Sequence, residues 1–279
     1  MNGIYVSALN KVMIYGFEGF YDSLVQAFGQ NPLSYQNFIN RTCRATLPLL
    51  CHDEAMYYAV AYGISHFKTF GDVLASYITP NNIHTYENVI DYGCGQGIAT
   101  AAYIDYLAKN RRHDSIGLNV YLIEPSAISL TIAKKLVRNM ADFHGVMINV
   151  HAICGELDKV ILPVASHAYR TVHLFNNVLD VPTVRASLPR LSRQMQSIDG
   201  EHVVLACSPD YSDAMKGFRT LSHKLGVPDV DIYQYSIAHQ EYRVIQQQWR
   251  MSNSVRIGMG FEFCIGEPYD FYHGFDKCS

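Results

Sequence analysis

The sequence has few charged residues, no paired-cysteine spacing and no long apolar run, and each shortage argues against a class of protein. Asp, Glu, Lys and Arg make up 17% of the chain, and the formal net charge is −3. A protein that binds nucleic acid mainly by neutralising phosphates would carry more positive charge. No apolar run reaches the roughly 20 residues of a membrane-spanning helix, and the start lacks the charged and apolar segments of a signal peptide. We therefore expect a cytoplasmic protein without a membrane-spanning segment.

None of the seven cysteines lies in a Cys-x-x-Cys pair, and the count is odd. This usage is typical of a reducing compartment and offers no pattern for a disulfide framework or a zinc ribbon. The run Cys51–Glu54 places possible metal ligands next to one another, but consecutive residues of a helix face different directions. We therefore predict no metal site.

Hydrophobic residues make up 49% of the 279-residue chain, which is enough for one large domain or for one domain with an extension. The first part carries few charges and has apolar residues at helical spacing, such as Met56, Val60 and Phe67. We predict a helical N-terminal cap over residues 1–85 that packs on the rest of the chain. The low overall charge also leaves room for a covering partner, and a homodimer is one candidate.

Over residues 86–279 the sequence pattern alternates between strands and helices. Residues 88–91 form a short apolar strand pattern, residues 97–109 a helical pattern, and Ser126 is placed to cap a later helix. This alternation predicts a doubly wound α/β fold, with a mostly parallel sheet and helices on both faces. The strictly alternating segment 254–266 follows another strand-like segment without a helix between them, so the sheet should end in an antiparallel pair.

The segment DYGCGQG, residues 91–97, joins the first strand to the first helix. Glycines at such a turn let the backbone approach a ligand closely. In a dinucleotide fingerprint the third small residue would fall on Ile98, which is too large for close packing, and no Lys-Ser/Thr pair follows as in a phosphate loop. The spacing suits a nucleoside carrying an amino acid, whose carboxylate would meet backbone N–H groups at a helix N-terminus. Asp91 would order the loop and attract the positively charged end.

The longer segment VIDYGCGQG, residues 89–97, resembles motif I of the class I S-adenosylmethionine (SAM)-dependent methyltransferases. The resemblance covers roughly residues 86–267 and implies a seven-stranded, Rossmann-like sheet whose C-terminal strand is antiparallel. It also implies SAM as the cofactor. The residues that would bind SAM are Asp91, Gly93, Cys94, Gly95, Gly97, Glu124, Pro125, Glu156, Leu157, Phe175 and Asn176.

Two acids beyond the glycine loop support this resemblance. Glu124 ends the second strand, where an acid can accept hydrogen bonds from both ribose hydroxyls; the alternative is that it only caps the next helix. Glu156 follows the third strand, where the family often has an acid near the adenine amino group, and Leu157 would contact the ring. In the alternative, Glu156 is a solvated loop carboxylate.

The catalytic residues are less clearly marked, because methyl transfer from a sulfonium needs a positioned nucleophile and only sometimes a base. We expect the acceptor beyond the carboxyl ends of strands four and five. Asn176 would contact the acceptor or the cofactor, unless it serves only the turn. Asp210 and Tyr211, after strand five, are candidates for a base or an acceptor contact. His66 is a further candidate base, although a lone helix histidine is more often a packing residue.

The leading hypothesis is a methyltransferase that modifies an oxygen, nitrogen or sulfur atom of a small-molecule acceptor. The sequence NNVL at 176–179 counts against DNA and glutamine amino-methyltransferases, which carry a Pro-Pro pair there. Three alternatives stay open. The first is a non-catalytic SAM-binding regulatory or structural subunit, and the second is a methyltransferase acting on RNA or protein. The third is an NAD-dependent oxidoreductase, against which Ile98 argues.

Overall fold

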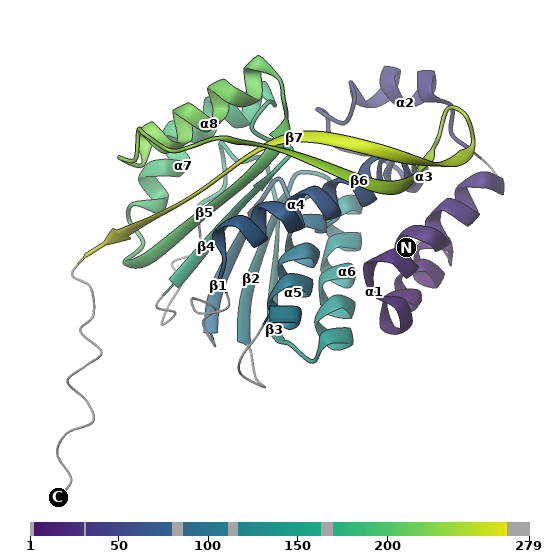
Figure 1. The fold of residues 1–279 in the computed structure, drawn as a ribbon, viewed down its shortest axis with the longest axis horizontal. Coiled ribbons are helices and arrows are strands. Elements are labelled where there is room, and N and C mark those ends of the chain that lie inside the picture. Colours follow the sequence, from purple (N-terminus) through teal and green to yellow (C-terminus); the bar gives the residue numbers. More distant parts are fainter. Residues whose placement is uncertain (1–2, 31, 80–85, 111–116, 163–169, 267–279) are drawn as a thin grey trace, which may run out of the picture.

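The structure is a doubly wound α/β fold built on one seven-stranded sheet (Figure 1). The computed structural model describes residues 3–30, 32–79, 86–110, 117–162 and 170–266. The strands are β1 (Tyr86–Tyr92), β2 (Gly117–Glu124), β3 (Met147–Cys154), β4 (Arg170–Asn176), β5 (Gly200–Pro209), β6 (Tyr233–Arg243) and β7 (Gln248–Ile265). β1 to β5 are parallel, whereas β7 runs antiparallel to both β5 and β6. The predicted fold class is therefore confirmed.

The strand order, β3-β2-β1-β4-β5-β7-β6, places a switch point between β1 and β4. The chain builds outward from β1 to β3 and then returns to place β4 on the other side of β1. At such a point the connections diverge, and a crevice opens at the carboxyl ends of the strands. The residues that end β1, β2 and β4 therefore border one space.

Helices cover both faces of the sheet, as the alternating pattern predicts. On one face, α5 (Ile98–Asn110) and α6 (Ala127–His144) lie beside helices from the N-terminal part, and α7 (Pro182–Met195) and α8 (Ser212–Lys224) cover the other face (Figure 1). Successive strand residues supply the two cores: Val89 packs with the first group of helices and Ile90 with the second. Ser126 caps α6, because its Oγ accepts a hydrogen bond from the Ser129 N–H at 3.1 Å.

The N-terminal part contributes α1 (Gly3–Gln30), α2 (Tyr35–Thr42), α3 (His52–Tyr58), a short π-helix η1 (Ala59–Gly63) and α4 (Ile64–Tyr77). α1 packs along α6, and α4 packs on α5 and β6. Phe17 of α1 stacks on Phe67 of α4 at a ring separation of 4.1 Å. These helices share one hydrophobic core with α5, α6 and the sheet. Within the described residues, no helix is long and apolar enough to cross a membrane.

Two glycines of β7 let α4 lie directly on the sheet. A side chain at Gly258 would come within 2.6 Å of Val73, and one at Gly260 would overlap the ring of Tyr77. The alternating pattern of β7 therefore has a packing cause. Its large apolar residues point to the core beneath α7 and α8, and its glycines face α4.

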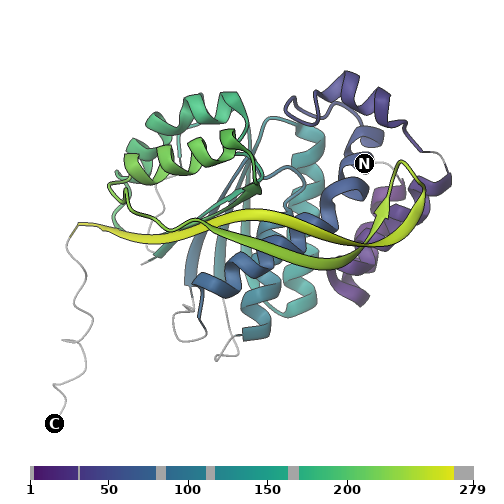
Figure 2. The same cartoon turned by 45° about the horizontal axis from the view of Figure 1, so that its top comes forward.

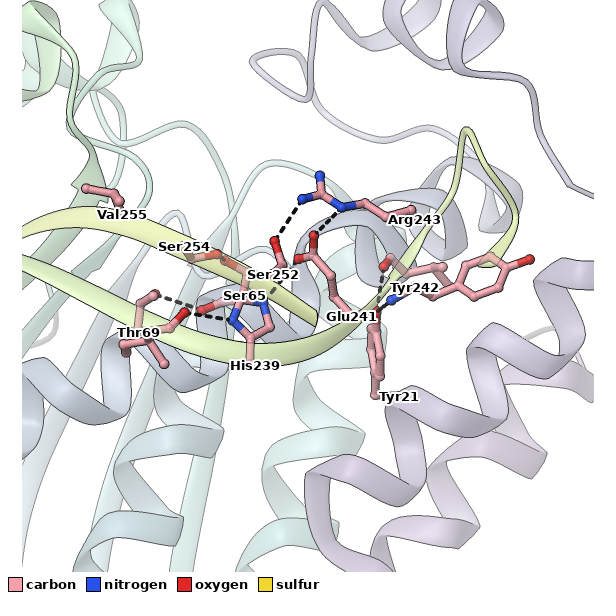
Figure 3. Close-up of polar contacts among 12 residues, drawn as sticks. Tyr21, Ser65, Thr69, His239, Glu241, Tyr242, Arg243, Ser252, Ser254 and Val255 are labelled. Atoms are coloured by element: carbon pink, nitrogen blue, oxygen red, sulfur yellow. Dashed lines mark hydrogen bonds and ion pairs between the residues drawn. The ribbon is translucent and has the colours of Figure 1, made fainter. Parts of the chain in front are cut away.

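The β6–β7 hairpin extends beyond the sheet and lies across α4 toward α1 (Figure 2). β5 pairs with β7 only from Arg256 to Ile265, so the first part of β7 pairs with β6 alone. Hydrogen bonds fix this projecting part on the helices (Figure 3). The Tyr21 hydroxyl accepts from the Tyr242 N–H and donates to the Val60 carbonyl, each at 3.0 Å, and the Ser65 and Ser254 hydroxyls lie 2.7 Å apart.

Candidate functional site

A cavity of about 380 Å³ lies at the carboxyl ends of the strands around the switch point. The glycine loop after β1 forms one wall, and the ends of β2, β3 and β4 and the first turns of α7 form others. Its roof is the segment 45–49, which connects α2 and α3. The predicted site residues that line it are His66, Asp91, Gly93, Cys94, Gly95, Glu124, Pro125, Glu156, Leu157 and Asn176.

The three glycines of the loop all adopt left-handed backbone conformations, with φ of 62° at Gly93, 52° at Gly95 and 78° at Gly97. A Cβ at Gly97 would lie 3.0 Å from Val137 and 3.1 Å from Ala133, so this glycine allows α6 to pack closely. A Cβ at Gly95 would meet nothing within 4 Å. Gly97 therefore serves packing, whereas Gly95 leaves bare backbone facing an open space that a ligand can use.

Glu124 is buried at the end of β2 and organises this loop. One carboxylate oxygen accepts a hydrogen bond from the Gly95 N–H at 3.1 Å, and the other accepts from the Ser126 N–H at 3.0 Å. Burial raises the pKa of Glu124, and these two N–H groups oppose that shift. Because a carboxylate has about four lone-pair positions, Glu124 can still accept two hydroxyl donors from the cavity.

Asp91 lies at the base of the loop and is only 1% exposed. The Thr100 hydroxyl donates to its carboxylate at 2.7 Å. Burial raises the pKa of Asp91 to about 7, and hydrogen bonds from Thr100 oppose the shift. No Lys, Arg or His among the described residues offsets the charge of Asp91 or Glu124. The loop end of the cavity is therefore suited to a positively charged group.

The N-terminal helices hold the glycine loop, which the sequence did not predict. The buried Gln96 donates from Nε2 to the Ala55 carbonyl at 2.7 Å and accepts from the Tyr5 hydroxyl at 3.4 Å. Ser126 Oγ donates to the Leu49 carbonyl at 2.6 Å and so fixes the roof. No local sequence pattern predicts this role of Gln96, because its partners Ala55 and Tyr5 lie far away along the chain.

Another wall residue, Ser129, also escaped prediction. Its hydroxyl is buried, lines the cavity and has no hydrogen-bond partner in the described structure. Nearby at the end of β3, the exposed Glu156 pairs with Lys159 at 2.6 Å, whereas Leu157 is buried against the cavity. Leu157 thus has the surroundings expected of an apolar ring contact, and the role of Glu156 at an adenine remains a prediction.

The side of the cavity nearest β4 carries Asn176 and Asn177. Asn177 Nδ2 donates to Asn176 Oδ1 at 2.6 Å, while Asn177 Oδ1 is buried without a partner. Asn177 also has a left-handed backbone, with φ of 58°. A strained residue with an unpaired buried polar atom beside a cavity is typical of a functional position.

His66 of α4 also lines the cavity, and it is buried and packs on the rings of Tyr58 and Tyr62. The Tyr58 hydroxyl lies 3.5 Å from His66 Nδ1, and the π-helix η1 separates the two residues along the chain. Burial, and then the nearby Arg256, lower the pKa of His66 to about 3. His66 is therefore neutral at physiological pH, and it can accept a hydrogen bond but is a weak base.

Four predicted site residues lie away from the cavity surface. Gly97 packs beneath it on α6, and Phe175 is buried in the core, where it stacks on Tyr92 at 4.4 Å. Asp210 is exposed and accepts from Gln234 at 3.1 Å, and Tyr211 is 62% exposed. Asp210 and Tyr211 therefore do not line the cavity that His66 and Asn176 border.

Comparison with known proteins returns structures but no sequence families. No family model and no curated protein sequence matches the chain. A precorrin 8w decarboxylase from Methanobacterium thermoautotrophicum matches with 14% identity over 71% of this chain and 90% of that chain, at a TM-score of 0.42. A precorrin-6Y C5,15-methyltransferase from Geobacter metallireducens matches with 10% identity, covering 70% and 85%, at 0.41. A putative RNA methyltransferase from Pyrococcus horikoshii matches with 12% identity, covering 72% and 85%, at 0.42.

The strand order, with the antiparallel β7 between β5 and β6, identifies the fold. It is the doubly wound, Rossmann-like α/β fold that the sequence predicts. Identities of 10–14% and TM-scores near 0.4 carry no conclusion about the ligand or the acceptor of this chain. Those follow only from its own residues. Among the described residues, no group of three or more His, Cys, Asp or Glu side chains is arranged to hold a metal ion.

Proposed function

We propose that this chain is a SAM-dependent methyltransferase that acts on a small-molecule acceptor. The observation that carries the proposal is the pair of buried carboxylates, Asp91 and Glu124, which face one cavity and have no cationic partner among the described residues. A buried carboxylate without a cation is costly. A ligand that brings positive charge therefore fits best, and SAM carries both a sulfonium and an ammonium group.

Different residues around the cavity would contact different parts of such a ligand. Glu124 has lone pairs left for two ribose hydroxyls, and Asp91 supplies negative charge at the amino-acid end. The bare backbone at Gly95 allows close approach, and Leu157 offers an apolar surface for a base. SAM would supply an activated methyl group, and the protein's task is then to exclude water and orient the acceptor.

The same charges argue against NAD. Its pyrophosphate would lie at the glycine loop, where the ionised Asp91 would repel it. The volume of the cavity, about 380 Å³, suits one ligand of ordinary size. With the roof 45–49 over it, the cavity favours a small acceptor over a folded macromolecule. Asn176 and His66, on the β4 side, are the candidates for contact with that acceptor.

Calorimetry with SAM, its demethylated product S-adenosylhomocysteine and NAD tests the proposal. We expect SAM and its product to bind and NAD not to bind. Gly95→Arg should abolish binding, because the arginine side chain would enter the open space above the loop. Gly226→Arg is the matched control, since a Cβ there also meets nothing within 4 Å and the backbone is also left-handed, with φ of 82°, but Gly226 follows α8 and does not line the cavity. Binding of NAD alone, or binding of SAM unchanged in Gly95→Arg, would refute the proposal.

A second candidate, a SAM-binding subunit without catalysis, is favoured by one observation. Asp210 and Tyr211 lie away from the cavity and His66 is a weak base, so none of the predicted catalytic bases has both the position and the pKa for proton removal. A screen with methyl-labelled SAM separates the two functions. Label transferred to any small molecule supports the enzyme, and SAM binding without transfer supports the subunit.

A further inference from the structure

We propose that two copies of this chain form a dimer by antiparallel pairing of β3, the strand at one edge of the sheet (Figure 1). Such an interface lies outside the cavity and goes beyond the proposed function. Three features of β3 favour a second copy as the partner. The strand is exposed and unprotected, its backbone groups face outward, and its side chains match those of a second copy in one register.

The sequence of β3 lacks the devices that protect a sheet edge from pairing. Its eight residues, MINVHAIC, include no charged residue, proline or glycine, and its pairing with β2 runs from Met147 to Cys154 without a bulge. Natural proteins commonly protect an edge strand with charges, proline or bulges, or keep it very short. The opposite edge strand, β6, carries Glu241 and Arg243, which form an ion pair at 2.8 Å. β3 is therefore the edge that is open to another strand.

The side chains of β3 are exposed on both faces of the sheet. Met147 is 64% exposed, and Asn149 and His151 on the same face are exposed as well. The described residues 155–162, which follow β3, form no helix that could cover this face. On the other face, Ala152 is exposed beside α6. Both faces at this edge therefore offer surface that a partner can bury.

The backbone of β3 presents hydrogen-bonding groups to the outside at every second residue. The Gly155 N–H donates to the Glu124 carbonyl of β2 at 3.2 Å, which fixes the alternation along the strand. By this alternation Ile148, Val150 and Ala152 turn their N–H and C=O groups away from β2. A second copy with its Val150 opposite this Val150 would form three hydrogen-bonded residue pairs, of two bonds each, about a two-fold axis.

The side chains of Asn149 and His151 favour this register. Asn149 Nδ2 donates to His151 Nε2 at 3.0 Å, and the His151 ring stacks on Tyr121 at 4.7 Å. Because Nε2 accepts, the hydrogen of the neutral imidazole is on Nδ1. Asn149 Oδ1 and His151 Nδ1 have no hydrogen-bond partner among the described residues. With Val150 on the two-fold axis, Asn149 lies opposite His151 of the second copy, so a free acceptor meets a free donor twice.

The two neighbouring registers lose this match. With the axis at His151, the two imidazole N–H donors would face each other and Asn149 would lie opposite Ile153. With the axis at Asn149, His151 would lie opposite Met147. In the proposed register Met147 lies opposite Ile153, so that apolar side chains also meet. The strand is thus complementary to itself in one register, as an interface between identical subunits requires.

Sedimentation equilibrium of the full chain tests this interface, and we expect the wild type to be a dimer at micromolar concentration. Asn149→Lys combined with His151→Lys places like charges opposite each other twice, so the dissociation constant should rise about 30-fold or more. Asn149→Lys combined with His151→Glu places opposite charges there, and the dimer should be retained. If the axis were at His151, the second variant would instead bring two introduced carboxylates together and dissociate.

Ala238→Lys combined with Gln240→Lys is the matched control, because both residues are exposed on β6 at the other edge, and its dimer should persist. Both β3 variants lose the stacking of His151 on Tyr121, so a general loss of folding would dissociate both alike. A monomeric wild type, a dimer that survives the two lysines in β3, or dissociation of the lysine–glutamate variant or of the control would overturn the inference. None of these outcomes bears on SAM binding, because no residue of β3 lines the cavity.

Discussion

The two ends of the cavity differ in how completely their polar groups are satisfied. At the glycine-loop end, Glu124 accepts hydrogen bonds from the N–H groups of Gly95 and Ser126, and Asp91 accepts one from the Thr100 hydroxyl of α5. At the β4 end, Asn177 Oδ1 is buried with no hydrogen-bond partner among the described residues, and the same holds for Asp180 Oδ1 and Arg256 Nε, which lie off the cavity wall. The glycine-loop end is therefore preorganised by hydrogen bonds within the protein, whereas the β4 end retains a polar atom that no described group uses.

We expect the glycine-loop end to determine the affinity for the cofactor and the β4 end to determine which acceptor is used. A preorganised loop holds a common cofactor with little reorganisation. An end with unpaired donors and acceptors discriminates among acceptors, because only a matching molecule satisfies them. Ser129, unpaired at the loop end, is the exception and is available for a further cofactor contact.

The largest expected effect is at the preorganised end, with Glu124→Ala. The change leaves the N–H groups of Gly95 and Ser126 without their acceptor and removes the proposed ribose contact. We expect SAM affinity in calorimetry to fall about 100-fold, which corresponds to two lost charge-assisted hydrogen bonds. Glu156→Ala, at an exposed carboxylate, should lower it far less. Equal losses of SAM affinity in the two variants would show that the buried Glu124 contributes no more to binding than the exposed Glu156.

Asp91→Asn should separate ligand binding from stability, with a loss of about tenfold in SAM affinity at pH 8. Asp91 has a pKa of about 7 in the folded protein against 3.8 ordinarily. A raised folded pKa contributes stability that is complete below pH 3.8 and lost as pH rises through 7. The ligand-free variant should therefore exceed wild type in stability above pH 7, by on the order of 2 kcal/mol. Urea unfolding between pH 5 and 8 measures this difference.

The same pKa predicts how SAM binding depends on pH. Because the ionised Asp91 attracts the cationic ligand, wild-type affinity should rise between pH 6 and 8, and that of Asp91→Asn should stay flat. Parallel pH profiles in the two proteins would show that Asp91 does not face the ligand's charge.

Gln96→Ala should have a smaller effect, on the link between the N-terminal helices and the loop. It removes the bonds to Ala55 and Tyr5, at roughly 1–2 kcal/mol of unfolding free energy. SAM affinity should fall several-fold while selectivity among acceptors is retained. Gln36→Ala, at an exposed pair in α2, is the control. Lost stability with wild-type affinity would mean that the helices support the fold but not the loop.

The smallest effect is expected at the β4 end, with Asn177→Gly. Glycine relieves the left-handed backbone and removes the unpaired Oδ1, so thermal stability should rise by about 0.5–1 kcal/mol. Methyl transfer should fall at the same time, as expected when an unsatisfied residue is retained for function. A destabilised variant with full transfer would show that Asn177 is only a turn residue.

Local patterns predicted much of this protein and failed at identifiable places. The strands, the Ser126 cap and the antiparallel strand at the C-terminus follow from period and capping chemistry, and the structure confirms them. The sequence positions of Glu124 and Leu157, at the ends of consecutive strands, place them at the cavity. Asp210 and Tyr211 follow the same rule but do not reach it, because the direction of a loop after its strand depends on packing that no local pattern contains.

The sequence by itself determined the α/β architecture and the glycine loop, because backbone geometry and hydrophobic period act over a few residues. Only the tertiary structure decided that Gln96 bonds to α3, that the roof 45–49 covers the cavity and that Arg256 contacts Ser65. These contacts join segments 41 to 191 residues apart. Such pairs are brought together by the burial of a shared core, and their chemistry is visible only once that core has formed.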